Sequence, residues 1–230
     1  MRTLGTMTIL TALAAMPGAC AYAHGGGPMG GSSMPSTSGA SRPEDLAKAA
    51  YNSGVHSIKK AQDSDADAAK ATTPEKSAKA SAKARSYYQD AVKRFVEAVG
   101  QQPTMYQAWN YLGFANRHLG NYDDSLSAYA KALELNPNYP DAIEYRGEAY
   151  LGLNKIESAK DAYMSLFRDS RKLADELMVA MRHWTDSHRQ DAQGVAPEDI
   201  EAFAQWVDER SHIAAQTASL AVGAAPTIWR

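Results

Sequence analysis

The residues near the start of the chain that could do chemistry are one histidine and two methionines. His24 is followed by Met29 and Met34, in a stretch made mostly of Gly, Pro and Ser. If His24 became the first residue of a processed chain, its amine and imidazole would suit Cu(II), and the methionine sulfurs would add soft ligands. The alternative is a low-complexity leader without a chemical role, because an unstructured segment imposes little geometric selection on a metal.

Three aspartates farther along, Asp63, Asp65 and Asp67, alternate as they do at the start of a calcium-binding loop. Such a loop needs glycine at its sixth position and glutamate at its twelfth. Ala68 and Pro74 stand at these positions. We therefore predict a solvated acidic turn rather than a calcium site.

The remaining candidates for catalysis lie near the C-terminus. His183 and His188 are five residues apart on an expected helix, which places them on different faces. Asp186, Ser187 and His188 are close in sequence, but this does not produce the geometry of a catalytic triad. The sequence has no H-E-x-x-H motif, phosphate-binding loop, nucleophile elbow or paired cysteines. We predict that the protein is not an enzyme, and we expect no cofactor and no metal site in its repeats.

The elements that would position a binding site are helices, and the clearest pair lies in residues 106–139. Trp109, Leu112 and Leu119 recur at helical spacing and give the first helix an apolar stripe. Gly113 lies on that stripe, where a side chain would hold a second helix away. An interior glycine costs about 1 kcal/mol in a helix, so close packing must offset it.

Turn and breaker residues define the second helix of the pair. Gly120 and Asn121 tolerate the left-handed conformation that ends a helix. The second helix is expected at about 122–135, and Pro137 follows it as a breaker.

Together these residues resemble a tetratricopeptide repeat, whose pattern is W-x-x-L-G-x-x-Y, then A-x-x-x-F, then P. The resemblance rests on Trp109, Leu112, Gly113, Gly120, Tyr122, Ser125, Tyr129, Ala132 and Pro137. The sequence departs from the pattern at Asn116, where the family prefers Tyr. The resemblance implies an all-α, right-handed solenoid of helical hairpins, with about three repeats needed to bury a continuous core.

A third repeat is expected at residues 140–172, directly after the second at 106–139. Its markers are Tyr145, Gly147 and Tyr163, which follow Tyr111, Gly113 and Tyr129 at one period, since 147 − 113 = 34.

The first repeat is expected at residues 43–105, in a divided form. A helix at about 43–61 places Gly54 in the glycine position, and the second helix is marked by Ala91, Phe95, Ala98 and Pro103. Residues 62–80 are rich in Ala, Lys, Asp, Ser and Thr, and too poor in apolar residues for a core. We interpret them as an insertion between the two helices.

Residues 173–220 are expected to form two capping helices, because the end of a solenoid must be covered. A stripe of Leu173, Leu177, Met181 and Trp184 marks the first, and we expect a break before it at residues 169–172. Pro197 starts the second helix. Residues 221–230 are predicted to be a loose tail.

Composition fits this architecture. The chain has 230 residues, 44% of them hydrophobic, which suffices for a sizeable helical core. Its net charge of −2 and the lack of a basic stripe with interleaved aromatics argue against a nucleic-acid partner.

Residues 1–23 have the layout of a secretory signal peptide. Arg2 precedes a moderately apolar run that is too short for the about 20 residues of a membrane span. Ala21-Tyr22-Ala23 forms an A-x-A signal, which predicts cleavage before His24. We expect a periplasmic or secreted protein with a flexible leader at residues 24–42 and no membrane span.

Cys20, the single cysteine, leaves an alternative open. Gly18 and Ala19 suit a lipobox, in which Cys20 would become the lipidated first residue, but Pro17 stands where Leu is expected. We therefore prefer soluble export.

The resemblance implies that a protein or peptide ligand binds the concave face formed by the first helices. The residues expected there are Asn110, Tyr111, Phe114, Arg117, Asp141, Glu144, Tyr145 and Glu148, extended by Tyr51, Asn52 and Val55. Tyr111 and Tyr145 would either face the groove or pack between repeats. Family members that capture a C-terminal carboxylate use Lys and Arg in the third repeat, where this chain has acidic residues. A partner carrying Lys or Arg is therefore favoured.

These features predict a protein- or peptide-binding adaptor or scaffold. The second hypothesis is a periplasmic copper-handling protein that uses the His/Met leader, with the repeats as a docking platform. Metal titration of the processed chain, with and without residues 24–41, would distinguish the two.

Overall fold

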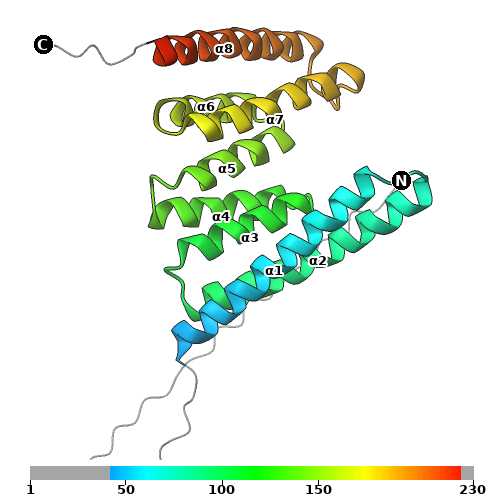
Figure 1. The fold of residues 1–230 in the computed structure, drawn as a ribbon, viewed down its shortest axis with the longest axis vertical. Coiled ribbons are helices and arrows are strands. Elements are labelled where there is room, and N and C mark those ends of the chain that lie inside the picture. The colour runs from blue at the N-terminus through cyan, green and yellow to red at the C-terminus, as the bar shows by residue number, and fades with distance from the viewer. Residues whose placement is uncertain (1–41, 224–230) are drawn as a thin grey trace, which may run out of the picture. The chain divides into compact units, whose positions relative to one another are not determined.

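The computed structural model describes residues 42–223, and helices make up most of this range (Figure 1). They are α1 (Pro43–Ala69), α2 (Pro74–Gln101), α3 (Tyr106–His118), α4 (Tyr122–Leu135), α5 (Pro140–Gly152), α6 (Ile156–Asp169), α7 (Arg171–Gln190) and α8 (Pro197–Gly223). No strand occurs between residues 42 and 223, so the predicted all-α hairpin solenoid is confirmed. The predicted signal peptide at residues 1–23, Cys20, His24, Met29, Met34 and residues 224–230 lie outside the described residues.

Proline and acidic residues fix the start of the first helix, as the sequence predicts. Pro43 is the first residue of α1, where a missing amide hydrogen costs nothing. Glu44 and Asp45 follow in the first turn, where the helix dipole favours negative charge. At the next start, the Thr73 hydroxyl accepts a hydrogen bond from the Lys76 amide at 3.3 Å and caps α2.

The first two hairpins each close over a glycine. A Cβ atom on Gly54 would lie 2.7 Å from the Phe95 ring, and one on Gly113 would lie 2.6 Å from the Tyr129 ring. Real Cβ atoms do not approach a neighbour this closely, so the observed helix crossings require glycine. Gly54 thus has the role expected of it, and α1 and α2 form the first hairpin.

The third hairpin, α5 and α6, packs differently. A Cβ atom on Gly147 would lie 2.7 Å from Leu177 of α7 and 3.2 Å from Ala162 of α6. Tyr163, the aromatic residue expected beside this glycine, instead contacts Trp206 of α8, with ring centroids 5.5 Å apart. A leucine from the following helix therefore fills the space over the third glycine.

Residues 62–80, which we call the arm, are not the separate insertion that their composition predicts. They lengthen α1 and α2, and only residues 70–73 turn. Small side chains let the two backbones approach closely: Ser64 is buried within the arm, and Ala61 and Ala84 are buried at its base. The low apolar content of this segment therefore does not prevent it from forming helices.

The aspartates of the arm also lie on helix α1, whereas their spacing predicts a turn. The Tyr88 hydroxyl donates a hydrogen bond to Asp65 at 2.7 Å, and the Ser77 hydroxyl donates to the Ala68 carbonyl at 3.2 Å. Asp63 and Asp67 are exposed. Polar contacts thus join the two helices where large apolar side chains are missing.

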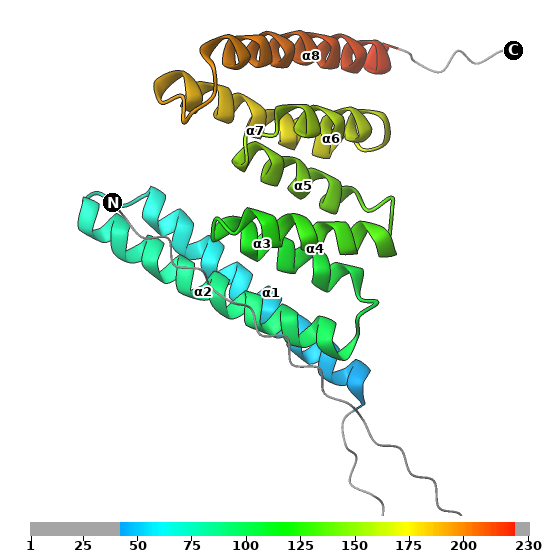
Figure 2. The ribbon, with the colours of Figure 1, turned by 180° about the vertical axis from the view of Figure 1, so that it is seen from behind.

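The arm projects past the end of α3 (Figures 1 and 2). Tyr88 stacks on His118, the last residue of α3, with ring centroids 4.5 Å apart. Helix α2 begins 88 − 74 = 14 residues before this contact. At a rise of 1.5 Å per residue, this part of α2 extends about 20 Å beyond α3.

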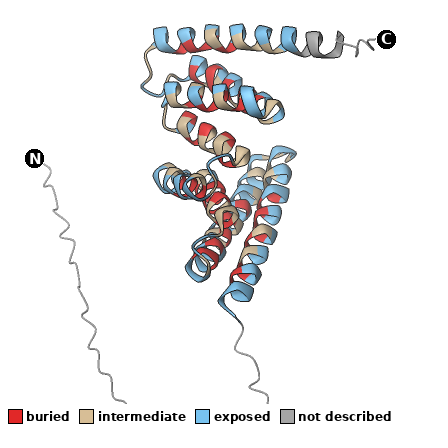
Figure 3. Cartoon of the chain, turned by 90° about the vertical axis from the view of Figure 1, so that its left-hand side faces the viewer, coloured by how far each residue is buried: buried red, intermediate tan, exposed pale blue. Residues whose placement is uncertain are grey.

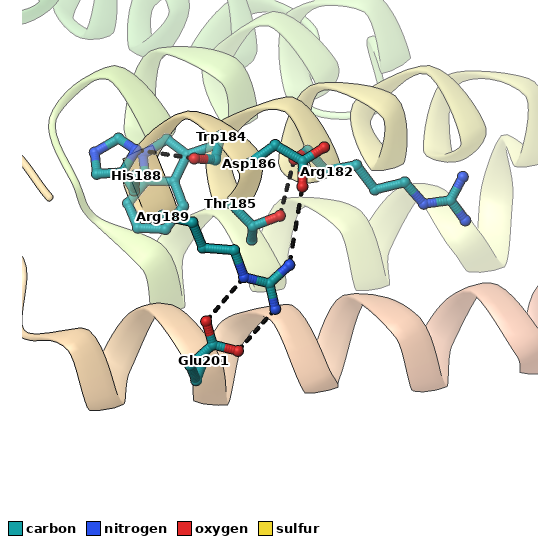
Figure 4. A network of polar contacts seen from close by, with 7 residues as sticks. All are labelled: Arg182, Trp184, Thr185, Asp186, His188, Arg189 and Glu201. Carbon is teal, nitrogen blue, oxygen red and sulfur yellow. Dashed lines mark hydrogen bonds and ion pairs between the residues drawn. The ribbon is translucent and has the colours of Figure 1, made fainter. Parts of the chain in front are cut away.

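The C-terminal helices pack on the third hairpin. Helix α6 ends at Asp169 and α7 begins at Arg171, so the break expected at residues 169–172 is confirmed. Arg189 of α7 donates hydrogen bonds of 2.8 and 2.7 Å to Glu201 of α8 (Figure 4). The outer side of α8 is exposed (Figure 3), which suits the end of a solenoid.

The buried residues lie between the helices along the stack (Figure 3). One cluster contains Phe95, Leu112 and Phe114, and another contains Leu177 and Phe203. A smaller cluster around Tyr129 lies between the second and third hairpins. Among residues 42–223, none of the helices has the length and apolarity to cross a membrane.

Candidate binding face

A row of aromatic rings connects the three hairpins. Tyr111 of α3 stacks on Phe95 of α2 at 5.6 Å between centroids and meets Tyr51 of α1 edge-on at 5.9 Å. Phe114 continues the row at 6.4 Å from Tyr111 and contacts Tyr145 of α5 at 5.0 Å. Aromatic pairs in such geometries contribute about 0.5–1.5 kcal/mol beyond their buried area. The row therefore helps to fix the positions of α1, α3 and α5.

We call the side of α1, α3 and α5 that carries this row the first-helix face, and we define it so that it includes all eight predicted binding residues, whether buried or exposed. It comprises Tyr51, Tyr106, Asn110, Tyr111, Phe114, Arg117, Tyr139, Asp141, Glu144, Tyr145 and Glu148. Three of the predicted residues, Asn110, Phe114 and Glu144, are buried, with relative exposures of 1%, 5% and 3%. These three do not reach the accessible surface, because neighbouring helices pack over them.

The other five predicted residues, Tyr111, Arg117, Asp141, Tyr145 and Glu148, are partly exposed. Tyr111 and Tyr145 pack between repeats and also retain accessible surface, so both expected roles are compatible. Burial, and after it the charge of Glu144, raises the pKa of Tyr145 to about 12.

Arg117 and Glu148, predicted as separate ligand contacts, form an ion pair with each other. Their side chains are 17% and 23% exposed. The Arg117 guanidinium also lies 5.3 Å from the Phe114 ring centroid and 5.7 Å from that of Tyr145. Because Arg117 belongs to α3 and Glu148 to α5, this pair joins the second and third hairpins.

Glu144 is the most perturbed carboxyl group on this face. Burial, and then repulsion by Glu148, raises its pKa to about 8, while Arg117 opposes the shift. Glu144 Oε2 has no hydrogen-bond partner among the described residues. Asn110 Oδ1, one repeat earlier, also lacks a partner within residues 42–223. Two buried side-chain oxygens without a partner therefore lie at equivalent positions of α3 and α5.

Tyrosines also gather at the N-terminal ends of α3 and α5. Tyr106, the first residue of α3, meets Tyr139, the residue before α5, with centroids 5.0 Å apart. Our sequence-based site included neither residue. The available signal was that each stands at the start of a first helix, directly before the predicted binding positions.

A hollow of about 450 Å³ lies where the C-terminal ends of α3 and α5 meet α7. Arg117, His118, Glu148, His183 and His188 are among its lining residues. His118 keeps an exposed edge but stacks on Tyr88, and desolvation by its neighbours, followed by the nearby Arg117 charge, lowers its pKa. Both effects favour the neutral imidazole.

The two C-terminal histidines have different environments, as their spacing predicts. His183 is exposed, whereas His188 is buried and stacks on Trp184 at 3.8 Å between centroids (Figure 4). Its Nδ1 lies 2.9 Å from the Trp184 carbonyl and its Nε2 lies 3.1 Å from Asn154 Oδ1. These contacts give His188 a structural role. Within residues 42–223, no cluster of three metal-ligating His, Cys, Asp or Glu side chains occurs.

A family comparison agrees with the geometry of the second hairpin. The model for the tetratricopeptide repeat matches residues 106–139, which span α3 and α4. This match supports a tetratricopeptide repeat protein and, more generally, a protein-interaction adaptor or scaffold. The chain is thus an all-α solenoid of helical hairpins whose second hairpin is a tetratricopeptide repeat.

Proposed function

We propose that the protein is an exported adaptor that binds a protein or peptide on its first-helix face. The observation that carries this proposal is the set of three partly exposed tyrosines in the aromatic row, one each from α1, α3 and α5. Tyr51, Tyr111 and Tyr145 each combine a fixed ring with accessible surface. Rigid aromatic side chains that lose little conformational freedom on binding are common anchors of protein interfaces.

The charge of this face favours a partner that carries Lys or Arg. Asp141 contributes a partly exposed acidic group, and Glu148 contributes a second that is paired with Arg117. Glu144, whose pKa is raised to about 8, is buried and adds charge only at higher pH. Complementary charge increases association rates and discourages partners of the wrong sign. Binding should therefore weaken as salt screens this interaction.

Export is supported by the layout of residues 1–23. Cleavage after Ala23 would release a chain that begins at His24. N-terminal sequencing of the protein from a periplasmic fraction tests this, since a lipid-modified Cys20 would give a different mass and first residue.

Site-directed photocrosslinking tests the binding face. A photoreactive phenylalanine analogue replaces Tyr111 or Tyr145, and a matched probe replaces the exposed Lys131 of α4. We expect the same protein adduct from both tyrosine positions and none from position 131. Adducts only from position 131 would contradict binding by the first-helix face. The adduct, identified by mass spectrometry, gives the partner.

A further inference from the structure

A hollow of about 410 Å³ is lined by residues of α4, α5 and α6, and we call it the Arg146 hollow. Arg146 and Tyr150 of α5 are four residues apart, so they share one face of their helix. Ser158 and Ser165 of α6 are seven residues apart and also share a face. The remaining lining residues are Leu133, Pro137, Ile143, Asp161 and Ala162.

This hollow lies on the opposite side of α5 from the first-helix face. Arg146 is two residues from Glu144 and two from Glu148, both of which belong to that face. At 3.6 residues per turn, two residues correspond to about 200° around the helix axis. A ligand in the Arg146 hollow would therefore leave the first-helix face free.

Arg146 brings an unpaired positive charge into the hollow. Its side chain is partly buried, and within residues 42–223 it forms no ion pair and no side-chain hydrogen bond. Its Nε is buried without a partner, while the guanidinium lies 5.9 Å from the Tyr150 ring centroid. A buried N–H donor without a partner is unfavourable, so Arg146 favours a ligand that supplies hydrogen-bond acceptors.

The other polar groups of the hollow limit the charge of such a ligand. The hydroxyls of Ser158 and Ser165 form no hydrogen bond in the described part of the chain, so they are available as donors. Asp161 lines the same hollow but is exposed, and it does not pair with Arg146. Water stabilises an exposed carboxylate but not a buried Nε, so the arginine decides which charge is favoured. With Asp161 nearby, a single negative charge suits the hollow better than a double one.

The Arg146 hollow continues into a second hollow of about 340 Å³. Pro137, Ile143 and Ser165 line both hollows, and Pro140 and Leu166 add apolar surface to the second. A groove of two connected hollows has room for the residues beside the bound group. A segment of a protein therefore fits it better than a free ion does.

We infer that the Arg146 hollow binds the carboxylate of an Asp or Glu side chain in a segment of a second protein partner. A guanidinium pairs with a carboxylate through two parallel N–H···O hydrogen bonds, which match its planar fork. The site goes beyond the proposed function, because it uses no residue of the first-helix face. With both sites, the adaptor would hold a basic and an acidic partner at the same time.

Small probes test the chemistry of the hollow without a known partner. N-acetyl-glutamate α-amide is titrated into the full chain, and ¹⁵N NMR follows the backbone amides of Ser158 and Ser165 and the Nε–H of Arg146. N-acetyl-glutamine amide has nearly the same shape without the charge, and N-acetyl-phosphoserine amide carries a second negative charge. We expect saturable shifts with the glutamate probe, none with glutamine and no tighter binding of phosphoserine. Equal shifts with glutamine would overturn the inference, and tighter binding of phosphoserine would overturn it in favour of a phosphate site.

Matched variants test the residues of the hollow. Arg146→Met removes the charge and Arg146→Lys removes the planar fork, and each should weaken binding of the glutamate probe at least threefold. Asp161→Asn removes a repelling charge and should strengthen binding at least twofold at low salt. Arg182→Met, which removes an exposed arginine of α7, should leave the Kd unchanged.

Circular dichroism establishes that each variant retains its helices. Unchanged binding by folded Arg146→Met and Arg146→Lys, or weaker binding by Asp161→Asn, would refute the inference. Sedimentation of the full chain tests a different occupant. Self-association that Arg146→Met abolishes would place a second copy of the chain in the hollow and would also refute it. These measurements use no ligand of the first-helix face, so their outcome is independent of the photocrosslinking result.

Discussion

The close crossing of α3 and α4 predicts that adding one methyl group at Gly113 destabilises the second hairpin. The new Cβ atom of Gly113→Ala would lie 2.6 Å from the Tyr129 ring, whereas ordinary contacts begin near 3.4 Å. The ring would have to move by 3.4 − 2.6 = 0.8 Å, and it is fully buried, with 0% relative exposure. Neighbouring side chains therefore have to shift as well.

Gly100→Ala in α2 is the control that separates the cost of overpacking from the change in helix propensity. Gly100 is an exposed helical residue, and a Cβ atom there would meet nothing within 4 Å. Alanine stabilises a helix by up to about 1 kcal/mol relative to glycine, and both variants share this effect. Overpacking at Gly113 costs about 1–3 kcal/mol in addition. The free energies of unfolding of the two variants should therefore differ by about 1–3 kcal/mol.

Urea unfolding followed by far-UV circular dichroism measures this difference. With an m-value of about 2 kcal/mol per molar urea, the midpoint of Gly113→Ala should lie about 0.5–1.5 M below that of Gly100→Ala. Equal midpoints, or a higher midpoint for Gly113→Ala, would show that the two helices do not cross at this glycine.

Three further predictions concern charge and the arm. Glu144→Gln should flatten the pH dependence of stability. The pKa of Glu144 rises from about 4.5 in the unfolded chain to about 8 in the fold, so the protonated group stabilises the fold at low pH and this contribution is lost as the pH rises through about 8. Thermal melts between pH 5 and 9 would detect the flatter profile. Arg117→Met leaves Glu148 without its ion-pair partner and should lower the urea midpoint. Lys131→Met is the control, because its exposed pair with Glu134 is worth about 0–1 kcal/mol. Equal shifts of the two midpoints would show that Arg117 does not stabilise the contact between the second and third hairpins. Replacing residues 62–80 with a four-residue turn should cost about 1 kcal/mol for the lost Tyr88–Asp65 bond, while loss of most helical dichroism would show that the arm is essential to the core.

Much of the fold could be predicted from the sequence because the second hairpin places residues of distinct size at fixed positions. Gly113 predicts the helix crossing, and Gly120 with Pro137 marks the ends of the pair. The arm was misjudged because helix packing can rest on small side chains. Ser64 of the arm carries little hydrophobic signal yet is almost fully buried, and Asp65 and Ser77 hydrogen-bond between the two helices.

The candidate site could be predicted only in outline. The repeat period places Asn110 and Glu144 on the first helices, but it does not reveal how much of each side chain the next helix covers. Likewise, Arg117 and Glu148 are 31 residues apart, since 148 − 117 = 31, and their pairing depends on how α3 packs against α5. Such contacts are set by the relative positions of helices, which a pattern within one repeat does not specify.

The affinity of the photocrosslinked partner for Tyr111→Ala, compared with Lys131→Ala, tests the central claim most directly. Losing one aromatic contact at the interface should cost about 1–3 kcal/mol, which is about 5- to 150-fold in Kd. We predict such a loss for Tyr111→Ala, with its helical content preserved, and an unchanged Kd for Lys131→Ala, measured by titration calorimetry. An unchanged Kd for folded Tyr111→Ala together with weaker binding by Lys131→Ala would contradict the claim and place the interaction on the opposite surface.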